Sequence, residues 1–90
     1  MKIREMKAGI HYVVTKGTKD RAFKKGDKVE LCGLTKDILN KQAKGWMSFY
    51  DLEESGYLNM VYVEVDKEWY RNRKKILLEE LALLESIKDE

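Results

Sequence analysis

Apolar positions come in short runs over the first two thirds of the chain. The runs are separated by Gly, Lys and Asp and span residues 10–14, 29–32, 38–39, 46–47 and 57–65. Their lengths and their many β-branched and aromatic residues are typical of strands. We therefore predict five short β-strands between Ile10 and Val65, arranged as an all-β meander.

The last of these runs shows an alternating pattern. Val61, Val63 and Val65 alternate with Tyr62 and Glu64. Successive side chains of a strand point to opposite faces of a sheet. The pattern predicts one strand over 57–65, with a valine-lined face toward the core.

After Asp66 the period changes to that of a helix. Asp66 is a suitable N-cap, Glu68 suits the first turn, and no Gly or Pro follows to the end of the chain. We predict one helix over 67–88. The predicted fold class is α+β, mainly β, with a small five-stranded β-barrel over 1–65 and a C-terminal amphipathic helix over 66–90.

The apolar surface of this helix is broad. Tyr70, Leu77 and Leu84 lie seven residues apart with Leu81 between them, which is a heptad-like stripe. Trp69 and Ile76 lie on an adjacent stripe. We expect the stripe with Trp69 and Ile76 to pack on the barrel, leaving the other stripe for a second helix or a partner.

Charges along the predicted helix are segregated. Its first half is basic and its second half is acidic, an order that opposes the helix macrodipole; the residues are Arg71, Arg73, Lys74 and Lys75, then Glu79, Glu80, Glu85, Asp89 and Glu90. An antiparallel pair of such helices matches basic halves to acidic halves. We therefore predict a homodimer through this helix, the alternative being a monomer whose helix folds back on its own barrel.

Basic residues also gather near the N-terminus. Residues 1–28 hold nine Lys or Arg against three acidic residues, although the whole chain has a net charge of only +2. Five of them surround Gly17 and Gly26, which places them in loops: Lys16, Lys19, Arg21, Lys24 and Lys25. These five, with Arg71, Arg73, Lys74 and Lys75, are candidate contacts for an acidic partner or for phosphate, or simply a solvated surface. No exposed aromatic residue is evident near these lysines, which weighs against nucleic acid.

Two segments resemble bacterial SH3-like domains. Residues 23–31 are similar to the "apolar-Lys-Lys-Gly-x-Lys-Val-x-Val" strand entry of that family, and residues 45–52 resemble its closing "Gly-Trp-Val-Ser-x-x-Tyr-Leu" segment. The resemblance implies an SH3-like barrel in which Trp46 enters the barrel. It also implies a short helical turn around Tyr50 and Leu52 that leads into the next strand.

Residues typical of catalysis are scarce. The chain has one histidine, His11, and one cysteine, Cys32, which are too few for a zinc site. His11 follows an apolar residue within a predicted strand, so we expect a structural role for it, and we expect Cys32 to be a buried structural thiol. Gly17 does not begin a nucleotide-binding loop of known spacing. We predict that the protein is not an enzyme and holds no cofactor or metal.

The expected compartment is the cytoplasm, because the N-terminus carries many charges and lacks the apolar run of a signal peptide. No membrane association is expected.

The composition favours a binding module. We predict a phage or mobile-element accessory protein that binds and blocks a bacterial protein, such as a defence nuclease, in the manner of an anti-CRISPR inhibitor. The alternatives are a small barrel that binds nucleic acid through its basic loops and a housekeeping module that presents a groove to a peptide.

Overall fold

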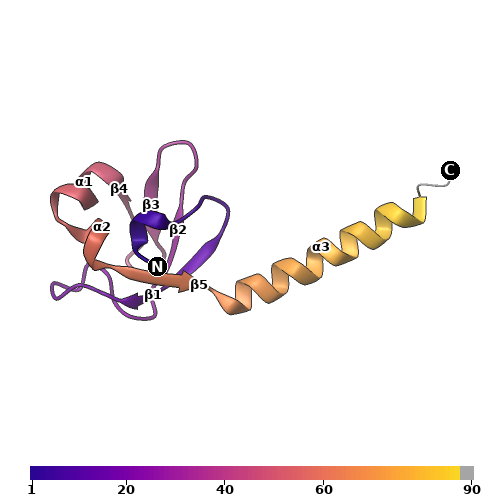
Figure 1. Cartoon of the computed structure of the whole chain (residues 1–90), viewed down its shortest axis with the longest axis horizontal. Coiled ribbons are helices and arrows are strands. Elements are labelled where there is room, and N and C mark those ends of the chain that lie inside the picture. Colours follow the sequence, from indigo (N-terminus) through magenta and orange to yellow (C-terminus); the bar gives the residue numbers. More distant parts are fainter. Residues whose placement is uncertain (88–90) are drawn as a thin grey trace.

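The computed structural model describes residues 1–87 and shows an antiparallel five-stranded sheet followed by a long helix (Figure 1). The strands are β1 (His11–Lys16), β2 (Lys28–Leu31), β3 (Asp37–Asn40), β4 (Gly45–Ser48) and β5 (Tyr62–Val65). Their order in the sheet is β4-β3-β2-β1-β5. The predicted α+β class is confirmed, but β4 and β5 are the edges of the sheet, which is not closed into a barrel.

Short helical segments connect or flank these strands. A 3-10 turn, η1 (Ile3–Glu5), precedes β1, and two short helices, α1 (Phe49–Glu54) and α2 (Tyr57–Met60), lie between β4 and β5. The helical turn expected around Tyr50 and Leu52 is therefore present as α1.

The prediction of one strand over 57–65 was wrong in its first half. Gly56 adopts a left-handed conformation (φ +81°), which only glycine adopts at little cost, and it opens α2 instead of a strand. The amide of Val61 then donates to the carbonyl of Tyr57 at 3.0 Å and closes this turn. The valine face is confirmed at Val61 and Val63, which are fully buried, whereas Val65 is only partly buried.

The core collects residues from segments far apart in the chain. Its buried apolar side chains are Ile3, Met6, Tyr12, Val14, Phe23, Val29, Ile38, Leu52, Leu58, Val61 and Val63. The N-terminal segment is fixed to β5, because the amide of Ile3 donates to Val61 at 2.9 Å and the amide of Val63 donates to Met1 at 2.8 Å. One face of the sheet is thus covered by η1, the loop that carries Phe23, and the segment of α1 and α2.

A buried polar pair holds the long β1–β2 loop against the sheet. The Asp27 carboxylate accepts from the backbone amide of Lys24 and from the Asn40 side-chain amide, both at 3.0 Å. Asn40 also donates to the carbonyl of Ala22 at 3.3 Å. Because buried polar groups are costly unless they are hydrogen-bonded, this network stabilises one position of the loop.

The helix α3 (Lys67–Ile87) begins where the sequence predicts, and residue 88 of the predicted range lies outside the described residues. The Asp66 carboxylate accepts from the amides of Glu68 (3.1 Å) and Trp69 (3.3 Å), as an N-cap does.

The described part of α3 extends away from the sheet (Figure 1). None of residues 67–87 is buried, and the molecule measures 57 × 24 × 22 Å. Its radius of gyration of 16.3 Å exceeds the roughly 12 Å of a compact chain of this length.

The predicted packing of Trp69 and Ile76 on the barrel was wrong for Ile76, which is 45% exposed. Trp69 is half-buried and stacks on His11, with ring centroids 4.9 Å apart.

Candidate binding surfaces

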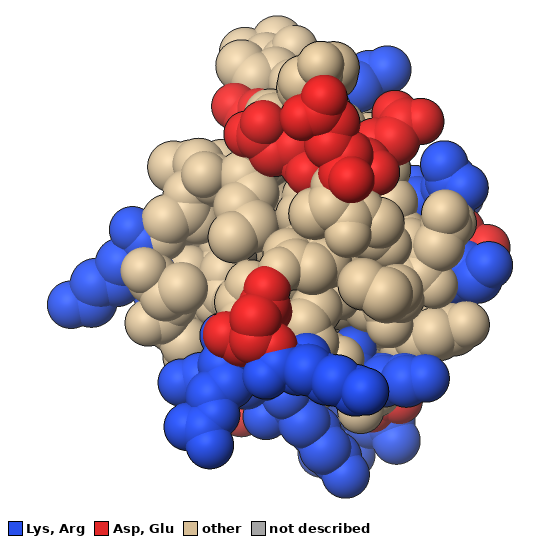
Figure 2. Space-filling view, turned by 90° about the vertical axis from the view of Figure 1, so that its left-hand side faces the viewer, with Lys and Arg blue, Asp and Glu red and all other residues tan. Residues whose placement is uncertain are grey.

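Four of the five basic residues near the N-terminus lie in a loop, as predicted, whereas Lys16 belongs to strand β1. All five are exposed; Lys16 ends β1 and the others lie in the β1–β2 loop: Lys19, Arg21, Lys24 and Lys25. Figure 2 shows the end of the molecule away from α3, where Lys and Arg gather along the lower edge. We call these five residues the basic loop surface.

Local hydrogen bonds shape this loop. The Asp20 carboxylate accepts from the amide of Ala22 at 3.1 Å, from the Thr18 hydroxyl and from the Tyr57 hydroxyl. The Thr18 hydroxyl bond, followed by the Ala22 amide, lowers the pKa of Asp20 below its ordinary value. Asp20 therefore stays ionised at neutral pH and ties the loop to α2.

A groove runs between this loop and α2. It has a volume of about 610 Å³ and is lined by Lys16, Gly17, Thr18, Lys19, Asp20, Tyr57, Asn59, Met60 and Tyr62. The Lys16 ammonium lies over the Tyr62 ring, 5.6 Å from its centroid. We expected no exposed aromatic residue near these lysines, and the aromatic residues that lie beside them, Tyr57 and Tyr62, are half-buried.

Sequence reasoning missed Tyr57 and Tyr62 as groove residues. Both were assigned to one predicted strand, which gave no reason to place them beside Lys16. The contact follows from the pairing of β1 with β5, in which Lys16 is the register partner of Tyr62.

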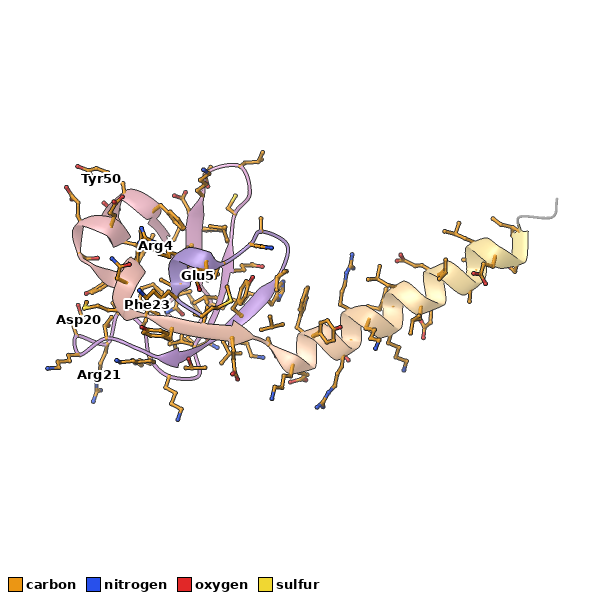
Figure 3. The ribbon with its side chains drawn as sticks, in the orientation of Figure 1. Arg4, Glu5, Asp20, Arg21, Phe23 and Tyr50 are labelled. Atoms are coloured by element: carbon orange, nitrogen blue, oxygen red, sulfur yellow. The ribbon has the colours of Figure 1, made fainter. Side chains whose placement is uncertain are left out.

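The four basic residues of α3 form a separate set. Arg71, Arg73, Lys74 and Lys75 are all exposed on the first half of the helix. The labelled Arg21 marks the opposite end of the molecule in Figure 3. The structure thus does not bring the two predicted basic sets together.

The largest exposed apolar surface lies on α3. The predicted helix face stays open: Tyr70 is 55% exposed, Leu77 49%, Leu81 52% and Leu84 60%. The second stripe and its neighbours are open as well: Ile76, Leu78, Leu83 and Ile87.

At the base of α3 this surface continues into a groove of about 410 Å³. Ile10, just before β1, and Val65 of β5 form one wall, and the helix contributes Trp69, Tyr70, Arg73, Lys74, Leu77 and Leu78. The groove is apolar apart from the two basic side chains of the helix, so its chemistry suits an apolar segment that also carries negative charge.

Known proteins give no guide here. Comparisons with protein-family models, curated proteins and solved structures found no match. Among residues 1–87, no helix is both long enough and apolar enough to cross a membrane, and no group of three or more His, Cys, Asp or Glu is placed to hold a metal ion.

His11 is held by its neighbours. Its Nε2 lies 3.1 Å from a Glu30 carboxylate oxygen, its Nδ1 lies 3.3 Å from the Lys41 ammonium, and its ring stacks on Trp69. These contacts fix the start of α3 against the sheet, in agreement with a structural role.

Cys32 differs from its predicted state. It is half-buried, not buried. Hydrogen bonding from the Thr35 hydroxyl, followed by the amides of Thr35 and Leu34, lowers the pKa of the thiol. This lowered pKa was not predictable from the sequence, because it comes from hydrogen bonds to Thr35 and Leu34 in the turn after β2.

Trp46 does not occupy the position that the family resemblance implies, whereas Tyr50 lies in the expected helical turn. Trp46 is 57% exposed on the edge strand β4, and Tyr50 is 68% exposed on α1. The expected entry of Trp46 into a barrel was therefore wrong, since its side chain lies on the face of β4 away from buried Ile38 and Leu52.

Proposed function

We propose that this chain is a non-catalytic binding module that acts by docking on another protein and blocking part of its surface. The observation that carries the proposal is α3, a helix of 21 residues with no buried residue and with large apolar side chains along its length. Contiguous exposed apolar surface of this kind marks protein interaction sites. A helix with few tertiary contacts is also marginal in water, so a bound partner would stabilise it.

The narrower form of the proposal is an accessory protein of a phage or mobile element that inhibits a bacterial protein, such as a defence nuclease, in the cytoplasm. Its supports are the small size, the dense charge of both signs and the projecting docking helix. The SH3-like barrel belongs to the same proposal. It is supported by the strand order, in which β5 returns beside β1, and by the helical α1 before it.

A pull-down from bacterial lysate tests this proposal. The bait is the tagged full chain, the lysate is treated with nuclease, and the washes use low and high salt. We expect a bacterial protein to be retained through high salt by the wild-type chain and lost from Leu77→Ser/Leu81→Ser, because burial of apolar side chains depends little on salt.

The matched control for this pull-down is Leu34→Ser. Leu34 is 96% exposed in the β2–β3 turn, so its replacement removes an exposed leucine that lies outside α3. Equal retention by the wild-type chain and the Leu77→Ser/Leu81→Ser variant would contradict a docking role for α3.

Nucleic-acid binding is a second candidate, favoured by the groove in which Lys16 lies over Tyr62 and Lys19 stands nearby. Basic side chains beside aromatic rings are the usual platform for single strands. This function requires affinity for an oligonucleotide that falls steeply with salt and is lost in Lys19→Ala/Arg21→Ala/Lys24→Ala/Lys25→Ala. Binding that is insensitive to salt and to these four substitutions would exclude it.

A further inference from the structure

We infer that the first partner of α3 is a second copy of this chain, bound antiparallel along the helix. The inference rests on the proposed function in one respect, namely that α3 is a protein-docking surface. The occupant is identified from three features of the described residues: the heptad seam, the segregation of charge, and the groove at the base of the helix.

The seam has the spacing of a two-helix interface. Tyr70, Lys74, Leu77, Leu81 and Leu84 follow one another at alternating steps of four and three residues, as in the a and d positions of a heptad. The aliphatic stem of Lys74 continues the apolar surface while its ammonium reaches solvent. The molecule's own sheet leaves this seam uncovered (Figure 1).

The charges select the orientation. In an antiparallel pair with Leu77 of one copy facing Leu81 of the other, the two-fold axis falls near Glu79. Glu85 of each copy then lies opposite Arg71 and Lys74 of the other copy. A parallel pair would set the basic halves against each other, which costs affinity. Beside the axis, Glu80 of one copy faces Glu80 of the other. The burial of Leu77 and Leu81 from both copies outweighs the repulsion between these two carboxylates.

The groove fits the end of the second helix. In this register Ile87 of the second copy lies opposite Arg73, which lines the groove together with the apolar wall of Ile10 and Val65. Tyr70, Lys74 and Leu77 line both the groove and the seam, so one continuous surface would receive a helix of about 30 Å. The basic rim of the groove faces the acidic half of the incoming helix.

The dimer also has a consequence for the basic loop surface. The β1–β2 loop lies at the end of the molecule away from α3 (Figure 3). Antiparallel pairing therefore leaves both basic loop surfaces free, one at each end of a longer rod. A single dimer would present two identical contact surfaces to acidic partners or phosphates.

Equilibrium sedimentation tests the pairing. We expect a species of twice 10.6 kDa for the wild-type chain and for Leu34→Ser at micromolar concentrations. Leu77→Ser/Leu81→Ser removes four leucines from the dimer and is expected to raise its Kd by at least about a hundredfold. A wild-type chain that stays at 10.6 kDa up to high micromolar concentration would overturn the inference.

Cross-linking tests the orientation. Arg71→Cys and Glu85→Cys are made in a Cys32→Ser background and treated with a short bismaleimide. We expect a cross-linked dimer from the mixture of the two variants and little from either alone. Efficient cross-linking of each variant with itself would show parallel pairing and overturn the inference.

The two proposals fail in different ways. If the wild-type chain is monomeric but captures a bacterial protein through Leu77 and Leu81, the inference of a second copy is wrong and the proposed function stands. If the chain is monomeric and captures nothing through these residues, both are wrong.

Discussion

Replacing Phe23 by alanine is expected to remove about 3–5 kcal/mol from the free energy of unfolding. Phe23 is fully buried although it lies in a loop, and its ring meets that of Tyr57 edge-on with centroids 6.1 Å apart. Its backbone amide also donates to the Thr18 hydroxyl at 3.3 Å. Small domains have a total stability near the low end of about 5–15 kcal/mol, so this loss leaves much of the variant unfolded.

Urea titration followed by near-ultraviolet circular dichroism measures this loss, because that signal reports aromatic packing and not the helicity of α3. The matched control is Tyr50→Ala, which removes an aromatic side chain that is 68% exposed. The control is expected to stay within about 0.5 kcal/mol of the wild-type chain. A Phe23→Ala variant less than about 1 kcal/mol below wild type would show that the loop does not contribute to the core.

Replacing Gly17 by alanine is expected to cost about 3 kcal/mol or more. A Cβ at this position would lie 2.0 Å from the carbonyl oxygen of Phe23 and 2.8 Å from its carbon. Both atoms are backbone, so no side chain can rotate away to relieve the clash. The loop must shift, which breaks the 2.9 Å hydrogen bond from the Thr18 amide to the Phe23 carbonyl.

Gly45→Ala is the control for this substitution. Gly45 lies in β4, and an added Cβ there meets nothing closer than the Ala43 carbonyl oxygen at 3.9 Å. The same urea titration is expected to place Gly45→Ala within about 0.5 kcal/mol of wild type. Equal stability of the two variants would mean that the loop does not approach Gly17 as closely as the structure has it.

The helix and most of the strands were predictable because their signals are local. Asp66 caps the helix with its own side chain, and no Gly or Pro interrupts the segment that follows. The strands were visible as short apolar runs, and the valine alternation correctly placed Val61 and Val63 in the core.

The failures arise where tertiary geometry decides. Tyr57–Met60 has the composition of a strand, but the left-handed Gly56 and the burial of Leu58 make it a helix. Trp46 was expected inside because the resemblance to SH3-like domains implies it, yet Trp46 lies on the edge strand β4 and is 57% exposed.

The candidate surfaces were predictable to a similar extent. The basic residues and the heptad stripe are contiguous patterns, so sequence alone placed them in a loop and on one helix face. The groove around Tyr57 and Tyr62 was not predictable, because it depends on the long-range pairing of β1 with β5. The exposure of Ile76 was also missed, since a broad apolar stripe is equally typical of a helix that packs on its own domain.

Hydrogen exchange of the α3 amides at increasing chain concentration tests most directly whether this helix is a docking surface. If α3 docks on a second copy, its exchange slows as the concentration rises while exchange in β1 and β2 stays unchanged, because an isolated helix of this length is only marginally stable. Strong protection of α3 that is the same at the lowest and highest concentrations would contradict docking, since it would mean that the helix is stabilised within a single chain.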